Sequence, residues 1–170
     1  MNEEQHLTIA GQDVTIRPIR VDDMDMEANF IRRLSPQTRY FRFLGGVKEL
    51  PTDELRRLCD VDGKHSMAYV ATFRERDGSE TEIGVSRFAP NSDWQAREMA
   101  VTVADGWQQH GVGTALAKQL IQYARQINVK VLYSVDFSQN TAMEALADEL
   151  GMSAHPDPDD AAQIIYSLRL

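Results

Sequence analysis

The sequence has only one cysteine, Cys59, among its 170 residues. A disulfide or a thiolate zinc site within one chain needs several cysteines at set spacings, so both are excluded. We expect Cys59 to be a buried apolar residue rather than a nucleophile. The lack of a disulfide framework favours a protein of the reducing cytoplasm that folds around an apolar core and uses no metal.

Long apolar runs and clusters of basic residues are also missing. No stretch approaches the roughly 18 apolar residues of a membrane span, and the acidic N-terminal residues do not resemble a signal peptide. The chain has 18 lysines and arginines against 26 aspartates and glutamates, which gives a net charge of −8. Because phosphate backbones attract clustered lysine and arginine, this balance disfavours nucleic-acid binding. We therefore expect neither a membrane nor a nucleic acid as a partner.

The patterns that are present predict a single domain over residues 1–170, with a core at about 13–168 and no linker or repeat. Strands are predicted at residues 7–9, 14–16, 67–73, 82–88, 97–103, 129–137 and 163–168. Helices are predicted at residues 26–34, 36–43, 52–58, 112–127 and 141–150. Residues 155–160, which contain two prolines, are predicted as a loop. This order predicts an α+β domain of three α/β/α layers, with a mixed, mostly antiparallel sheet of six to seven strands and helices on both faces.

The segment from Gln108 to Thr114 carries the clearest chemical signal, because it joins a predicted strand to a long amphipathic helix. Gly111 and Gly113 let the backbone approach a ligand closely, and the N–H groups at a helix start attract an anion such as a pyrophosphate. A dinucleotide fingerprint requires a third glycine where Leu116 stands, and a P-loop requires a Gly-Lys-Ser/Thr tripeptide that the sequence lacks. A glycine-containing turn without a ligand is the remaining alternative.

Two sequence motifs, which follow one another along the chain, resemble those of the GNAT superfamily of acyl-CoA-dependent N-acyltransferases. Residues 108–113 match its Q/R-x-x-G-x-G/A signature, and residues 140–152 are similar to its N-x-x-A-x-x-L-x4-G-F helix. Upstream, Thr15–Arg20, Leu34–Phe43 and Glu98–Val101 resemble the acetyltransferase domain of bacterial protein-lysine acetyltransferases that act on acyl-CoA synthetases. The resemblance implies a GNAT fold and acetyl-CoA as co-substrate.

The resemblance also implies which residues bind the co-substrate. The pyrophosphate is expected on backbone N–H groups of the glycine-containing turn, and the pantetheine arm is expected to pair with main-chain groups of the preceding strand. His110 is expected to contribute backbone rather than to act as a base, and Asn140 has helix capping as its alternative role. The expected cofactor-binding residues are Val101, Val103, Gln108, Gln109, His110, Gly111, Val112, Gly113, Thr114 and Asn140.

Glu98 is the candidate general base. An amine with a pKa near 10.4 must lose a proton before it attacks a thioester, and a carboxylate on the strand leading to the pantetheine is suited to accept it. In the resembled acetyltransferases a glutamate in this E-x-A-V context is the base. The alternative is a surface glutamate paired with an arginine. Ala147 stands where many GNAT enzymes have a tyrosine acid, so a tyrosine at that position is excluded here.

Other charged residues have weaker interpretations. Asp60 and Asp62 are candidates for holding a cationic substrate, with a helix-ending turn as the alternative. Arg39 and Arg42 lie three apart on a predicted helix, where they either contact a substrate protein or tie the helix down through carboxylates.

The function predicted from the sequence is transfer of acetyl from acetyl-CoA to a primary amine by direct attack in a ternary complex. The expected acceptor is a protein lysine, with an acyl-CoA synthetase as the candidate partner protein, and the expected state is a monomer or homodimer. A small amine or amino acid as acceptor, and a non-catalytic acyl-CoA-binding module, are the alternatives.

Overall fold

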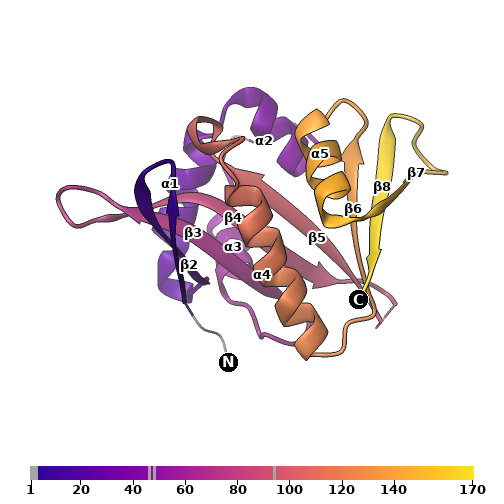
Figure 1. The fold of residues 1–170 in the computed structure, drawn as a ribbon, viewed down its shortest axis with the longest axis horizontal. Coiled ribbons are helices and arrows are strands. Elements are labelled where there is room, and N and C mark those ends of the chain that lie inside the picture. The colour runs from indigo at the N-terminus through magenta and orange to yellow at the C-terminus, as the bar shows by residue number, and fades with distance from the viewer. Residues whose placement is uncertain (1–3, 46, 48, 94) are drawn as a thin grey trace.

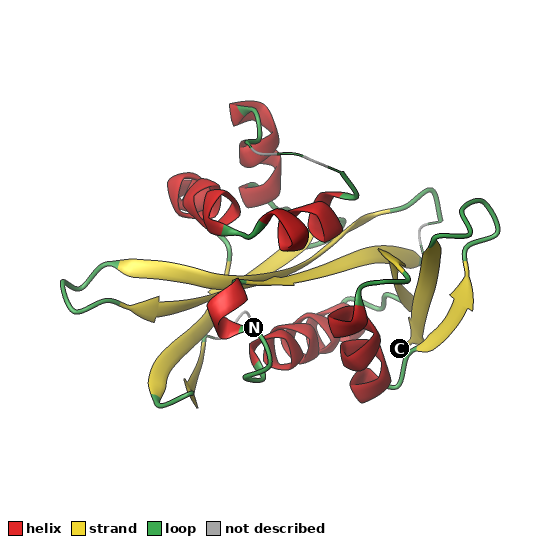
Figure 2. Ribbon diagram, turned by 90° about the horizontal axis from the view of Figure 1, so that it is seen from above, coloured by secondary structure: helices red, strands yellow, loops and turns green. Residues whose placement is uncertain are grey.

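A computed structural model describes residues 4–45, 47, 49–93 and 95–170, which form one eight-stranded sheet with helices on both faces (Figures 1 and 2). The strands are β1 (Gln5–Ile9), β2 (Gln12–Pro18), β3 (Met67–Arg74), β4 (Glu80–Pro90), β5 (Ala96–Val103), β6 (Val131–Phe137), β7 (Ser153–Pro156) and β8 (Gln163–Arg169). The helices are α1 (Met24–Arg33), α2 (Pro36–Phe43), α3 (Thr52–Cys59), α4 (Val112–Gln126) and α5 (Thr141–Leu150), with short 3₁₀ turns η1 (Val21–Asp23) and η2 (Asp105–Trp107). The strand order is β1-β2-β3-β4-β5-β6-β8-β7.

The predicted fold class is confirmed, but the sheet has eight strands rather than six to seven. β5 and β6 pair in parallel, and the other neighbouring strands pair antiparallel. The additional strand is β7, whose pairing with β8 aligns Ser153 with Ser167. All four β7 residues are exposed, so they show no apolar alternation, and their last two fall in the segment predicted as a loop. A short polar edge strand is held by its partner rather than by its own pattern.

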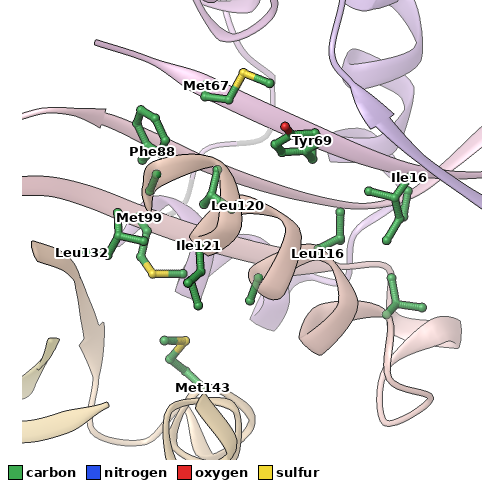
Figure 3. Close-up of a cluster of buried hydrophobic side chains, with 14 of the residues drawn as sticks. Ile16, Met67, Tyr69, Phe88, Met99, Leu116, Leu120, Ile121, Leu132 and Met143 are labelled. Atoms are coloured by element: carbon green, nitrogen blue, oxygen red, sulfur yellow. The ribbon is translucent and has the colours of Figure 1, made fainter. Parts of the chain in front are cut away.

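The two faces of the sheet have separate apolar cores. On one face α4 packs across the central strands, and Figure 3 shows Leu116 and Leu120 of this helix among Met67, Tyr69 and other buried side chains. On the other face, α1 and α3 cover a second cluster that includes Phe30, Ala68 and Cys59. The Cys59 side chain is buried, as predicted, and burial raises its thiol pKa to about 12. Because each face needs its own apolar cover, the alternating strands require helices on both sides.

The start of α2 follows its sequence signal. The Ser35 hydroxyl accepts a hydrogen bond from the Thr38 amide at 3.2 Å, and Pro36 occupies the first turn, where no N–H is needed. The helix ends at Leu44, which adopts a left-handed conformation with φ of 48°. Gly45 and Gly46 follow this helix in the sequence and predict a break there, but Gly46 lies outside the described residues. Of the helices that the structure describes, none has both the length and the apolar character needed to cross a membrane.

A cluster of ionisable side chains is buried between α1 and the sheet. The Arg87 guanidinium on β4 donates to Glu27 at 2.7 Å and to the Leu58 carbonyl at 2.9 Å. Glu82 is fully buried, and its carboxyl group lies beside that of Glu27. Burial and the neighbouring Glu27 raise the pKa of Glu82 well above its usual range. Glu82 therefore keeps its proton to a higher pH than an exposed glutamate does.

This retained proton predicts how Glu82 makes stability depend on pH. In the unfolded chain Glu82 loses its proton near pH 4.3, whereas in the folded chain it keeps it, so rising pH favours unfolding. We expect the Glu82→Gln variant to gain stability relative to wild type by about 1.4 kcal/mol per pH unit above about pH 5, up to the native pKa. Urea unfolding of both proteins from pH 5 to 8 measures this difference. A difference that does not change with pH would contradict the assignment.

Candidate active site

A cavity of about 630 Å³ opens where β5 and β6 separate. The two strands pair with each other only from Ala96 with Val131 to Glu98 with Tyr133. Beyond that point β5 continues to Val103 and β6 continues to Phe137, but the two strands no longer pair with each other. Figure 1 shows the two strands diverging, with α2 and α5 near the open end. Residues from α2, β5, β6, α5 and the turn before α4 line the cavity.

The α4 N-terminus forms one end of the cavity. Gly111 caps the helix with φ of 89° and Gln109 has φ of 62°, so the backbone turns sharply before Val112. The first amides of a helix have no partner within the helix and point outward, which suits an anion. A Cβ built on Gly111 would meet no atom within 4 Å, so the space beside this backbone is open. The turn before α4 therefore offers amide donors beside open space.

The free edge of β5 forms the adjoining wall. The Ala104 amide donates to Ile83 of β4, whereas the Val103 carbonyl faces away from β4 and accepts from the Gln108 side chain at 3.1 Å. Since strand residues alternate between the two edges, Val101 also directs its main chain toward the gap. The Val103 carbonyl is thus already occupied by Gln108, whereas main-chain groups at Val101, which β6 does not pair, are suited to pair with the amides of an extended ligand.

Gln108 connects this wall to α2 rather than reaching into the turn. Its side-chain nitrogen also contacts the Thr38 hydroxyl at 3.2 Å. The same hydroxyl donates to Asp105 at 2.8 Å, and Asp105 accepts from the Ser35 amide and hydroxyl at 2.8 and 2.6 Å. Burial opposes ionisation of Asp105, but these hydrogen bonds outweigh it and lower its pKa. The glycine-containing turn and α2 are thus held together by one hydrogen-bond network. The sequence did not predict a role for Asp105 in it.

The deeper part of the cavity is lined by charged groups. Glu98 is exposed to the cavity from β5 and lies beside Tyr133 of β6, whose pKa is raised by burial and by this carboxyl group. Asp136 lies on β6, where Ser134 donates a hydrogen bond to it. Burial raises the pKa of Asp136, although Ser134, Arg42 and Asn140 oppose the shift. This end of the cavity combines two acids with the Arg42 side chain of α2.

The structure brings most of the predicted site residues together. The predicted residues that line the cavity are Glu98, Val101, Val103, Gln108, Gln109, Gly111, Gly113, Thr114 and Asn140. His110 is exposed and Val112 is buried in the α4 core, so neither side chain lines it. The Asn140 side-chain oxygen accepts from the Met143 amide at 3.2 Å, which is the capping role considered as the alternative. The Asn140 side chain also hydrogen-bonds Asp136.

Asp60 and Asp62 lie elsewhere, at the end of α3, and do not line the cavity. One Asp62 oxygen accepts from the amides of Lys64, His65 and Ser66, and the other contacts the His65 ring at 2.7 Å. Hydrogen bonds from Ser66 and its neighbours lower the pKa of Asp62 far below its usual range. The turn interpretation of Asp62 accounts for all of these contacts. No group of three or more histidine, cysteine or acidic side chains in the described part of the chain is arranged to hold a metal ion.

Comparison with known proteins agrees with this geometry. Residues 13–153 match the family model described as an acetyltransferase (GNAT) domain. The chain is 44% identical over 160 residues to acetyltransferase PA5475 of Pseudomonas aeruginosa, covering 94% of this chain and 86% of that protein.

Two solved structures show the same fold at low sequence identity. The GNAT domain of S. lividans PAT superposes with a TM-score of 0.86 at 20% identity, over 98% of this chain and 97% of that one. A cAMP-binding acyltransferase from Mycobacterium smegmatis superposes with a TM-score of 0.65 at 21% identity, over 98% of this chain but 47% of that one.

Proposed function

Because the chain belongs to the GNAT family of acyl-CoA-dependent N-acetyltransferases, we propose that its acceptor is a lysine side chain on a protein and that Glu98 is the general base. The observation that carries the proposal is the exposed Glu98 carboxylate in a cavity whose other end is a helix N-terminus open to an anion. The lysine acceptor is favoured by the resemblance of Leu34–Phe43 and Glu98–Val101 to bacterial protein-lysine acetyltransferases. Location in the cytoplasm is part of the same proposal.

Different residues of the site have different roles in the proposed acetyl transfer. Acetyl-CoA supplies an activated acetyl thioester when it is bound. The amides from Val112 to Thr114 hold its phosphates, and the free main-chain edge at Val101 orients its extended arm. Glu98 accepts the proton of the incoming ammonium, which frees the nitrogen lone pair for attack. Ala147 is buried in α5 and has no group to donate a proton, so the CoA sulfur leaves as a thiolate without a tyrosine acid there. Because the corresponding thiol has a pKa near 8.5, the thiolate takes up the second proton, which the nitrogen loses as the amide forms.

An assay of the acceptor tests this proposal. The protein is incubated with acetyl-CoA and a set of acyl-CoA synthetases, and acetyl-lysine is measured by mass spectrometry against a control without enzyme. We expect acetyl-lysine on at least one synthetase. Transfer to polyamines or amino acids without any acetyl-lysine would instead show a small-molecule acceptor. Tight binding of CoA with no thiol release on any acceptor would show a non-catalytic binding module.

Glu149 predicts a separate effect on co-substrate affinity. Its carboxylate lines the cavity from α5 and accepts a hydrogen bond from the Thr114 hydroxyl at 2.7 Å, beside the turn proposed to hold the phosphates. A negative charge here repels a bound phosphate. We expect Glu149→Gln to bind acetyl-CoA about two- to fivefold more tightly at low salt, with the difference shrinking as salt screens the charge. Calorimetric titration at two ionic strengths measures this, and unchanged or weaker binding would place the phosphates elsewhere.

A further inference from the structure

Arg42 has a position that acetyl transfer to an amine does not explain. Its half-buried side chain lines the cavity from α2, near Glu98 and Asp136, which line the same cavity. Within the described chain its guanidinium makes no hydrogen bond, and no carboxylate oxygen lies within 4 Å of it. Its one recorded contact is with the ring of the adjacent Phe43, at 5.0 Å from the centroid.

The buried arginines Arg17 and Arg87 are bound in a different way. Arg17 makes two hydrogen bonds of 2.8 Å to Asp23 and one of 2.9 Å to Glu80. Arg87 donates to Glu27 and to a main-chain carbonyl. Burying a guanidinium away from water without an anionic partner is unfavourable, and both of these arginines have a carboxylate partner. Arg42 has no carboxylate partner among the described residues. The hypothesis that it holds α2 in place through a salt bridge to a carboxylate is therefore wrong for this part of the chain.

The electrostatic surroundings support the same interpretation. Burial and the nearby Arg87 lower the pKa of Arg42 to about 10, while Glu27, Asp136 and Glu98 partly oppose the shift. The nearby acids therefore compensate its charge only in part. Arg42 still remains protonated at neutral pH, since a pKa of about 10 lies well above 7. A carboxylate that enters the cavity could therefore accept hydrogen bonds from the charged, partly desolvated guanidinium of Arg42.

We propose that Arg42 binds a carboxylate carried by a substrate in the catalytic cavity, so that Glu98 serves the amine and Arg42 serves an anionic group a short distance away. This rests on the proposed function only in taking the cavity as the place where both substrates meet. Two sources supply the same chemistry. The carboxylate belongs either to the acceptor, such as an acidic residue beside the target lysine, or to the far end of a dicarboxylic acyl group.

The experiment compares substrates that differ only in the carboxylate. The acceptor arm uses lysine peptides with aspartate or asparagine next to the lysine, with acetyl-CoA as donor. The donor arm uses succinyl-CoA and butyryl-CoA with one neutral lysine peptide. Each arm measures kcat/KM and, independently of turnover, the dissociation constant, by calorimetry for the thioesters and by fluorescence anisotropy for labelled peptides with CoA present.

We expect wild type to prefer the carboxylate member of one arm by about 10- to 100-fold, as a charge-assisted hydrogen-bonded pair provides. Arg42→Gln should lose this preference while changing the neutral member by less than about threefold, and Arg42→Lys should retain part of it because the charge remains without the fork. Arg39→Gln is the matched control, since Arg39 lies on the same helix but does not line the cavity. Thermal unfolding checks that each variant is folded.

The outcomes separate the two proposals. A carboxylate preference that disappears in Arg42→Gln supports the carboxylate site, and the arm in which it appears names the source. No preference in either arm, or a preference that persists in Arg42→Gln, overturns it even if acetyl transfer is rapid. A binding preference without turnover on any acceptor would leave the carboxylate site intact and overturn the proposed acetyl transfer instead.

Discussion

Replacing Glu98 by glutamine should reduce kcat for acetyl transfer to lysine by about 10²- to 10⁴-fold at neutral pH, the range expected when a general base is lost. Glutamine has nearly the same shape but does not accept a proton from an ammonium. The affinity for acetyl-CoA should stay near the wild-type value, because the phosphate site proposed at the start of α4 and the free edge of β5 do not include this side chain. Steady-state kinetics and calorimetric titration measure the two quantities.

The pH dependence of the Glu98→Gln variant distinguishes a lost base from a distorted site. Free lysine side chains become neutral as pH approaches 10.4, and a neutral amine needs no base before it attacks. The deficit of the variant should therefore shrink as pH rises from 7 to 9.5. Glu54→Gln is a matched control, because Glu54 is an exposed glutamate on α3 and does not line the cavity. An unchanged rate at neutral pH would remove Glu98 as the base.

The parts of the site that the sequence predicts are those encoded by local rules. The turn before α4 can be predicted because Gly111 and Gly113 indicate a sharp, accessible backbone turn and an amphipathic helix follows directly. Strand alternation puts Glu98 on the opposite face from Met99, which is buried in the same apolar cluster as the α4 side chains. Each of these signals depends on residues within a few positions of one another.

The parts that the sequence does not predict depend on tertiary contacts. Asp136 and Arg42 line the same cavity because β6 separates from β5 and α2 lies near the gap, and no local sequence pattern predicts that they share it. Asn140 fits a cofactor-binding motif, yet its side-chain oxygen is used to begin α5. The strand β7 is likewise defined by its pairing with β8 and not by its own composition. Burial, partners and strand separation are properties of the whole fold, so local patterns carry little of this information.

The second large effect concerns the stability of the sheet beneath the cavity. Arg87 is aligned with Ala100 of β5, and its side chain and that of Glu27 are 10% and 2% exposed. Arg87→Met keeps most of the volume but leaves Glu27 as a buried charge without its partner, beside Glu82. We expect a loss of about 3–5 kcal/mol in the free energy of unfolding, because removing one member of a buried ion pair strands the other. For a domain of this size that corresponds to a fall in Tm of roughly 6–20 °C.

A second substitution tests whether the loss comes from the stranded charge or from lost packing. Adding Glu27→Gln to Arg87→Met removes the unpaired charge, and we expect it to recover at least half of the lost stability, since replacing both members of a buried pair by neutral groups is far less costly than removing one. Arg125→Met, an exposed arginine of α4, should change the free energy of unfolding by less than about 0.5 kcal/mol. Urea unfolding at pH 7 measures all three proteins. If the double variant is no more stable than Arg87→Met, the stabilisation comes from the contacts of the Arg87 side chain with Leu58 and its neighbours, and the buried charge of Glu27 contributes little.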